Sequence, residues 1–363
     1  MLKTTAASRG KTLIGLAAAF VLLMVRPCAA AQDGSTIRVR MGIHFVSSMG
    51  QSSAQVFDMA KGITNAIKDN YGLDLQLKTY SSGPEIKEAF LRNEIDAAAF
   101  WPGEAVEIME RGGSVHPWST FHVKKSKKSP FCLWQRKNEN PQGISAVAGK
   151  RLINTEYSVD WLLFLREFLY RNGIDKPLWR VFSSFTSVSG SNSAFMAVAA
   201  GDADFFWTYK DNEVILKLVS SNMANQVSHD FCSDSVYARA TIVFNGKTLS
   251  KDDLIKSDKA LVNFIRDINE LAKTNMGIKT LKQYMGLVQS RIVPARPDEF
   301  DYEVKLFKES RKRGWMAEAE FIVEQMDKAP KGKPVEIKTD YKTCRALCAG
   351  DKDEVKCVSD CMK

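Results

Sequence analysis

Short segments in which apolar and polar residues alternate are separated along this chain by segments in which apolar residues recur every three or four positions. Residues 36–43 alternate and predict a strand, which leads into a loop at Ser47 and Ser48. Residues 54–71 carry one apolar stripe at helical spacing, residues 73–80 alternate again, residues 86–92 predict a short helix, and residues 95–100 predict a buried strand. Strands that alternate with helices predict an α/β fold with mainly parallel sheets and right-handed crossovers.

The same layout returns further along the chain. Residues 150–154 predict a strand, 161–172 a helix, 178–185 a strand, 193–200 a helix and 202–207 another strand. We therefore expect two similar lobes, with lobe one formed by residues 36–125 and 240–328 and lobe two by residues 130–235. Residues 121–141 and 228–247 would form a two-strand hinge, after which the helices between residues 252 and 329 would complete lobe one. A two-strand hinge is typical of proteins whose lobes close on a ligand.

The N-terminus has the pattern of a secretory signal peptide. Lys3, Arg9 and Lys11 precede an apolar run over residues 12–25, and small residues follow up to Ala31. We expect cleavage near Ala31, so that residues 1–31 are the signal peptide and the mature chain is periplasmic or secreted. An uncleaved membrane anchor and an organelle transit peptide are the alternatives, although the run is shorter than the roughly 20 residues of a spanning helix.

Composition narrows the class of protein. The 363 residues are 45% hydrophobic and 26% charged, which excludes a disordered chain. The formal charge of +9 includes four basic residues and no acid in the first 31 positions, which leaves 47 − 42 = +5 for the rest. A charge of this size gives no reason to expect a nucleic-acid partner.

Four segments together resemble the periplasmic substrate-binding proteins of phosphonate, phosphite and phosphate ABC importers. They are residues 37–42, 91–97, 147–151 and 195–204, and the resemblance extends over roughly residues 36–323. It implies the type II periplasmic binding-protein fold, a small-molecule ligand between the lobes outside the carboxyl ends of the strands, and a membrane ABC importer permease or sensor as partner. Phosphonate binders of this kind hold the oxyanion on a Ser-Thr-Ser-Gly turn at a helix N-terminus. Here the matching residues 155–161 keep Ser158 and add the acids Glu156 and Asp160.

The candidate ligand-binding residues follow the predicted strands. They are His44, Ser47, Ser48, Trp101, Glu104, Tyr157, Ser158, Trp161, Trp207, Tyr209 and Asp211. Trp101 and Trp207 hold corresponding positions in the two lobes, and aromatic rings can stack on a planar ligand or enclose a cation. The ligand is a phosphorus oxyanion by resemblance, and a quaternary amine or other organic cation is the alternative. Each residue also has a structural alternative, such as packing of Trp161 against the core of lobe two.

Catalytic motifs are absent from the sequence. There is no Gly-x-Ser-x-Gly elbow, no phosphate-binding Gly-rich loop and no His-Glu-x-x-His helix, and the four histidines lack metal-ligand spacing. We therefore expect a monomeric binding protein with no enzymatic activity, no cofactor and no metal. An enzyme of unfamiliar type, or an interaction module that uses the Cys-rich tail, remains the alternative from a different class.

Six cysteines follow residue 31, an even number that favours disulfides in an exported chain. In the tail at residues 335–363, Cys344, Cys348, Cys357 and Cys361 form a twin Cys-x3-Cys pattern. Because residues four apart share a helix face, this pattern predicts a helical hairpin with the nested bridges Cys344 to Cys361 and Cys348 to Cys357. A four-thiolate zinc or iron-sulfur site is the alternative. Cys132 and Cys232 lie in the two crossings and would form a bridge if these run side by side.

Overall fold

A computed structural model gives the fold of the chain. It describes residues 36–44, 64–65, 67–81, 83–123, 129–137, 143–155, 159–188, 190–211, 227–274, 290–330, 332–348, 357–359 and 361. Residues 1–123 and 240–299 form unit 1, and residues 124–239 and 300–363 form unit 2. The signal peptide expected at residues 1–31 lies outside the described residues.

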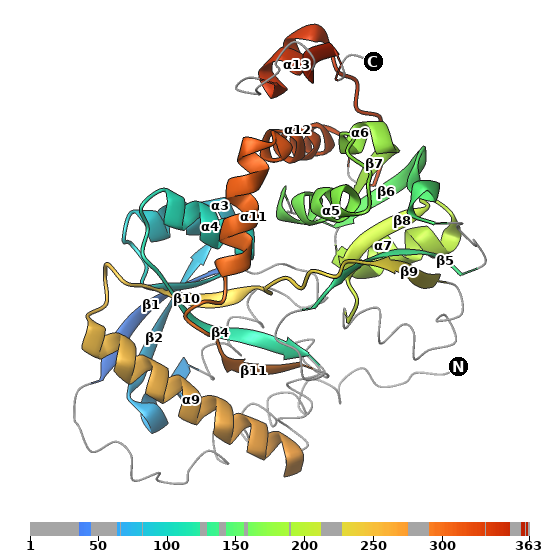
Figure 1. Ribbon diagram of the computed structural model, residues 1–363. Helices are drawn as coiled ribbons and strands as arrows, with labels where there is room; N and C mark the ends of the chain where they lie inside the picture. The colour runs from blue at the N-terminus through green and yellow to red at the C-terminus, as the bar shows by residue number, and fades with distance from the viewer. Residues whose placement is uncertain are drawn as a thin grey trace, which may run out of the picture. The chain divides into compact units, whose positions relative to one another are not determined.

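Unit 1 is built on a six-stranded sheet (Figure 1). Its elements are β1 (Ile37–His44), β2 (Leu73–Tyr80), α3 (Gly83–Leu91), β3 (Ala97–Phe100), α4 (Pro102–Glu110), β4 (Val115–Val123), β10 (Thr241–Asn245), α9 (Lys251–Thr274) and β11 (Ser290–Pro294). The sheet order is β11-β4-β10-β3-β1-β2, in which β1 pairs in parallel with β2 and β3 while the remaining pairs are antiparallel. Of the helix expected at residues 54–71, the described residues 64–65 and 67–71 are helical.

Unit 2 repeats this arrangement. Its elements are β5 (Phe131–Arg136), η1 (Ile144–Val147), β6 (Lys150–Thr155), α5 (Val159–Arg171), α6 (Leu178–Val181), β7 (Phe182–Val188), α7 (Gly190–Ala200), β8 (Phe205–Tyr209), β9 (Val227–Cys232), α11 (Asp301–Lys312), α12 (Trp315–Lys328), β12 (Pro334–Val335) and α13 (Tyr341–Leu347). The sheet order is β12-β7-β6-β8-β5-β9, with β6 parallel to β7 and β8. The parallel trio β2-β1-β3 of unit 1 thus corresponds to β7-β6-β8 of unit 2.

The predicted α/β fold with two similar units is confirmed, but the sheets, which we expect to be mainly parallel, also contain antiparallel pairs. Both sheets are mixed, because the strand that enters each unit pairs antiparallel with the third parallel strand. This is β5 against β8 in unit 2 and β10 against β3 in unit 1. The strand that leaves each unit then pairs with the entering strand, as β4 with β10 and β9 with β5.

The C-terminal helices belong to unit 2, whereas we had expected them to complete lobe one up to residue 328. On α12, the Glu318 carboxylate accepts hydrogen bonds from the Leu178 N–H and from Arg166 Nε, the latter at 3.3 Å. On α11, the Glu303 carboxylate accepts the Ala238 N–H at 2.6 Å. Figure 1 shows α12 beside α5. The chain therefore passes between the units three times, at residues 123–124, 239–240 and 299–300, rather than twice.

The contact of α12 with α6 also explains a wrong prediction. Residues 178–185 were expected to form one strand, but Leu178–Val181 form the short helix α6 and only Phe182 onward is extended. The Leu178 N–H at the start of α6 is satisfied by the Glu318 carboxylate, 140 residues away. A partner this distant cannot be read from the local pattern of apolar residues.

An arginine on the first parallel strand of each unit, β1 or β6, binds an aspartate that directly precedes the last parallel strand, β3 or β8. In unit 1, Arg40 donates its backbone N–H and Nε to Asp96 at 2.8 and 2.9 Å, and its Nη2 at 2.6 Å. In unit 2, Arg151 donates the same three groups to Asp204 at 2.8, 3.2 and 3.0 Å. Burial raises the pKa of Asp96 and Asp204, but the arginine hydrogen bonds outweigh it and hold both values below the usual range. These two pairs, the Arg–Asp clamps, fix β1 to β3 in unit 1 and β6 to β8 in unit 2.

All three predicted disulfides are present. Cys132 on β5 and Cys232 on β9 are direct cross-strand partners and form a bridge, so the entering and leaving strands of unit 2 do lie side by side. In the tail, Cys344 is bonded to Cys361 and Cys348 to Cys357, which is the predicted nested pattern. Since these four sulfur atoms are in disulfides, the alternative of a four-thiolate metal site is wrong.

The tail packs on unit 2. Its cysteines form a small buried cluster with Val358, and Trp179 of α6 packs against it. Arg180 donates to the Cys361 carbonyl at 2.8 Å. Strand β12 pairs with β7 and thereby covers that edge of the sheet. Within the described part of the chain, no helix has the length and apolar character needed to span a bilayer.

Candidate functional site

The candidate site of each unit is the edge where its parallel strands end. In unit 1 the chain runs from β1 to β2 on one side and then from β2 back past β1 to β3 on the other side, and in unit 2 β6 has the same relation to β7 and β8. Ligands of open α/β sheets bind outside the carboxyl ends of strands at such switch points. His44 ends β1 and Trp101 directly follows β3, so these two predicted residues lie at the switch point of unit 1. Ser47 and Ser48 lie outside the described residues, as does the side chain of His44.

Trp101 is the N-cap residue of α4 and its side chain is 36% exposed, among the more exposed large apolar side chains of the described residues. Its backbone N–H donates to Glu104 Oε2 at 2.9 Å. Burial raises the pKa of Glu104, and the Trp101 N–H opposes this effect. Glu104 thus caps α4 and fixes the backbone that carries the Trp101 ring, while the ring itself is accessible at the edge.

In unit 2, Trp161 lies in the first turn of α5 and is buried. Its ring meets Phe131 edge to face with centroids 5.1 Å apart, and Tyr209 at 6.2 Å. Trp161 therefore packs against the core beneath the start of α5, which was the structural alternative for this residue. Tyr157 and Ser158, which precede α5, lie outside the described residues.

The two aromatic residues predicted at the end of β8 are also buried. Trp207 is 1% exposed, stacks on Phe168 at 5.1 Å and contacts Phe131 at 5.4 Å. The Tyr209 hydroxyl donates to the Ala238 carbonyl at 2.5 Å, and burial raises the pKa of Tyr209 well above its usual value. These rings form part of the core of unit 2, so the expectation that Trp207 contacts a ligand receives no support.

Arg239, which was not among the predicted residues, lies at the same edge of unit 2. Asp211, just past the end of β8, forms an ion pair with Arg239 Nη2, and the Arg239 guanidinium lies 4.5 Å from the centroid of the Tyr209 ring. The side chains of Arg239 and Asp211 are 11% and 14% exposed. An arginine held by a carboxylate and an aromatic ring is a fixed cation. The pair joins residues 28 apart in sequence, and no local motif signals it.

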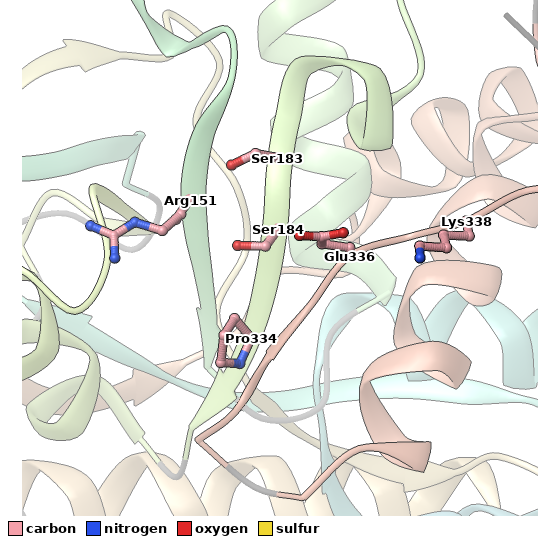
Figure 2. Close-up of a pocket in the computed structure, with 6 residues that line it drawn as sticks. All are labelled: Arg151, Ser183, Ser184, Pro334, Glu336 and Lys338. Atoms are coloured by element: carbon pink, nitrogen blue, oxygen red, sulfur yellow. The ribbon is translucent and has the colours of Figure 1, made fainter.

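A pocket of about 490 Å³ lies elsewhere in unit 2 (Figure 2). It is lined by Arg151, Ser183, Ser184, Pro334, Glu336 and Lys338, and so lies by the amino-terminal ends of β6 and β7. Arg151 is already bound there to Asp204 and to the carbonyls of Gly201 and Asp202, at 2.8 and 2.9 Å. The pocket is therefore at the opposite end of the strands from the edge where ligands of such sheets bind.

Two mixed α/β sheets, each with a switch point at the carboxyl edge of its parallel strands, define a type II periplasmic binding protein. The particular family is shown by the match of residues 45–261, more than half of the chain, to the model described as "ABC transporter, phosphonate, periplasmic substrate-binding protein". The chain belongs to this family of periplasmic proteins, and the predicted fold, family and periplasmic localisation are confirmed.

Several solved structures share the fold. PhnD1 from Prochlorococcus marinus, in complex with methylphosphonate, has a TM-score of 0.54 at 11% identity, covering 76% of this chain and 99% of that one. A binding protein component of an ABC phosphonate transporter from Pseudomonas aeruginosa has a TM-score of 0.51 at 13% identity, covering 81% and 97%. A Xanthomonas citri protein bound to ATP has a TM-score of 0.52 at 13% identity, covering 79% and 98%. A search of curated proteins finds no match.

Proposed function

We propose that this protein captures a phosphonate-, phosphite- or phosphate-like oxyanion at the carboxyl edges of its parallel strands and, as a monomer, delivers it to the permease of an ABC importer. The observation that carries the proposal is the match of residues 45–261 to the phosphonate-binding family. PhnD1, which shares the fold, was solved with methylphosphonate. The candidate contact residues of unit 1 are those near Trp101, and those of unit 2 are near Asp211 and Arg239.

Two features of unit 2 favour an oxyanion over an organic cation. Arg239 places the N–H donors of a guanidinium at the end of β8, in an ion pair with Asp211, where the sequence predicts one acid and two aromatic residues. An aromatic cage for a cation needs several accessible rings. The burial of Trp207 and Tyr209 in the core removes two of those considered for the cage.

The test is a thermal-shift and calorimetric panel on the mature protein. Methylphosphonate, phosphite and phosphate are compared with choline and glycine betaine, each at rising concentration. A ligand at 100 times its Kd stabilises the native state by about 2.7 kcal/mol. Stabilisation by at least one phosphorus oxyanion and by neither amine supports the proposal, while the reverse pattern contradicts it.

Two substitutions sharpen this test. Arg239→Lys keeps the charge but loses the planar guanidinium, and we expect it to weaken oxyanion binding at least tenfold. The matched control is Arg38→Lys, an arginine on β1 whose side chain is 72% exposed and lies 3.7 Å from Asp74. Equal affinities of the two variants would remove Arg239 from the ligand site and leave the family assignment intact.

The organic cation remains a second candidate because of Trp101, which is accessible at the edge of unit 1. If the ligand is a quaternary amine, Trp101→Ala should reduce its affinity by about five- to thirtyfold, since a desolvated cation–π contact contributes about 1–2 kcal/mol. Trp101→Phe is the control, since it keeps a ring in place. Affinity unchanged in Trp101→Ala would exclude this candidate.

A further inference from the structure

The outward face of α9 carries the two most exposed large apolar side chains among the described residues. Ile255 is 57% exposed and Val262 is 46% exposed. They are seven residues apart, which is two helical turns, so they lie on the same side of the helix. The opposite side of α9 packs through Ala260 and Phe264 into the core of unit 1, and Figure 1 shows the helix lying along the outside of that sheet.

Basic residues surround the two apolar side chains. At about 100° per residue, Lys251, Val262, Ile255, Arg266 and Lys259 fall within an arc of about 80° on α9. The lysines are exposed, and within the described part of the chain neither has a carboxylate within 4 Å. Arg266 pairs with the adjacent Asp267, yet its side chain is 61% exposed.

At about 100° per residue, the acids of α9 fall outside this arc. Asp253 is engaged as a capping partner of Ser250, and Asp258 binds His116 at 3.2 Å. Asp252 is the one exposed acid beside the arc that has no partner among the described residues. The outward face of α9, defined by Lys251, Ile255, Lys259, Val262 and Arg266 and called here the α9 face, is therefore basic with an apolar centre.

We propose that the α9 face binds the surface of an anionic phospholipid bilayer. Helices that lie on membranes bury apolar side chains at the boundary of headgroups and acyl chains, while lysine and arginine reach the phosphates of anionic lipids. A helix of 24 residues is about 36 Å long and presents a narrow ridge, which a deformable headgroup layer can accept. A specific protein partner would instead need about 800 Å² of fitted surface on each side.

This binding is distinct from ligand capture. It would keep the protein close to the membrane that holds its permease, with or without ligand, and it depends only on residues of α9. It would also be weak and reversible, because two partly exposed apolar side chains and a few basic ones are far less than a lipid anchor provides. Its strength should depend on salt, since the charges act within a Debye length of the surface.

The test is co-sedimentation of the mature protein with lipid vesicles. Vesicles of phosphatidylglycerol and phosphatidylcholine in equal parts should bind the protein at low salt, and vesicles of pure phosphatidylcholine should not. Raising the salt to about 1 M, where the Debye length is about 3 Å, should release it. Equal binding to both kinds of vesicle, or none to either, would overturn the proposal.

Matched variants locate the surface. Lys251→Gln with Lys259→Gln should lower vesicle affinity about 25-fold, or about fivefold for each lysine, because a lysine near an anionic leaflet contributes about 1 kcal/mol. Ile255→Ser with Val262→Ser should lower it at least fivefold. The control is Lys305→Gln with Lys308→Gln, which removes the same charge from two exposed lysines of α11.

A control pair that loses as much affinity as the α9 pair would show that only net charge matters and would overturn the assignment to this face. All variants should keep the melting temperature and oxyanion affinity of the parent, which separates this result from any failure of the proposed function. Loss of uptake in cells by the α9 variants, together with unchanged vesicle binding, would point to a protein partner and would also refute a bilayer site.

Discussion

The Arg–Asp clamp of unit 2 gives a stability prediction that can be worked out in detail. In Asp204→Asn the side chain keeps its shape but loses its charge and one of its two acceptor oxygens. Three hydrogen bonds from Arg151 reach the carboxylate, at 2.8, 3.2 and 3.0 Å. The amide oxygen of the variant can keep the two hydrogen bonds that reach Oδ2. The amide NH2 takes the place of Oδ1, so it faces the Arg151 Nη2 donor and repels it.

The magnitude follows from the exposure of the pair. A hydrogen bond to a charged group contributes about 1.5–3 kcal/mol when buried. The Asp204 side chain is 15% exposed but that of Arg151 is 40% exposed, so solvent screens the pair. We therefore expect Asp204→Asn to lower the free energy of unfolding of unit 2 by about 1–2 kcal/mol, or its melting temperature by about 2–8 °C.

The loss should depend on pH in a defined direction. Although burial alone would raise the pKa of Asp204, the hydrogen bonds from Arg151 hold it below its usual value in the folded protein. Stability from this carboxylate is complete above its unfolded pKa of about 3.9 and is lost as the pH falls through the folded value. The difference between parent and variant should be largest at neutral pH and shrink toward pH 3.

Urea unfolding followed by circular dichroism, at several pH values, measures this difference. The control is Asp298→Asn in unit 1, where Asp298 and Arg296 form an ion pair with side chains 48% and 66% exposed. We expect it to cost less than about 0.5 kcal/mol. Equal losses of stability in the two variants would refute this prediction, and so would a loss in Asp204→Asn that is as large at pH 3 as at pH 7.

Three further predictions concern unit 2 and the aromatic candidates. Burial raises the pKa of Glu318 to about 7, so its proton is held more tightly in the folded than in the unfolded state. The free energy of unfolding should then fall by up to about 3 kcal/mol as the pH rises from about 4.5 through 7, and Glu318→Gln should flatten this slope in pH-dependent urea melts. Replacing both Cys132 and Cys232 by Ser should lower the free energy of unfolding by about 2–5 kcal/mol, because the bridge joins residues 100 apart in the sequence. A loss smaller than the one caused by reducing the tail disulfides alone would contradict this. Trp207→Ala should cost about 3–5 kcal/mol in thermal melts because its side chain is in the core, while Trp101→Ala should stay within about 0.5 kcal/mol, and a reversed order would show that their burial is misassigned.

Much of the fold could be predicted from the sequence because its elements follow local periodicity. The strand at residues 73–80 was predicted with the bounds of β2, and the helix at residues 161–172 overlaps α5 almost completely. Errors arose where a distant side chain controls the backbone. The last parallel strands of the two units were predicted to begin at residues 95 and 202, but β3 begins at Ala97 and β8 at Phe205. There the Arg–Asp clamps replace regular pairing just before each strand.

The candidate site was predictable only in part. Position after a strand identified Trp101, which is accessible, but the same rule selected Trp207, which is buried. The two differ because β8 continues to Tyr209, so that Trp207 lies inside the strand, and because Phe168 of α5 and Phe131 of β5 pack on its ring. Arg239 escaped notice because its partners, Asp211 and Tyr209, are far from it in the sequence.

By itself, the sequence determined the alternation of strands and helices, the duplicated layout, the nested cysteine pairs of the tail and the resemblance to phosphonate-binding proteins. All of these depend on residues within one element or on spacing along one segment. Only the tertiary structure decided that α11 and α12 belong to unit 2, that the chain passes between the units three times, and that Arg239 joins the edge of β8. Those outcomes depend on contacts such as that of Glu318 with Leu178, between residues whose separation along the chain gives no local signal.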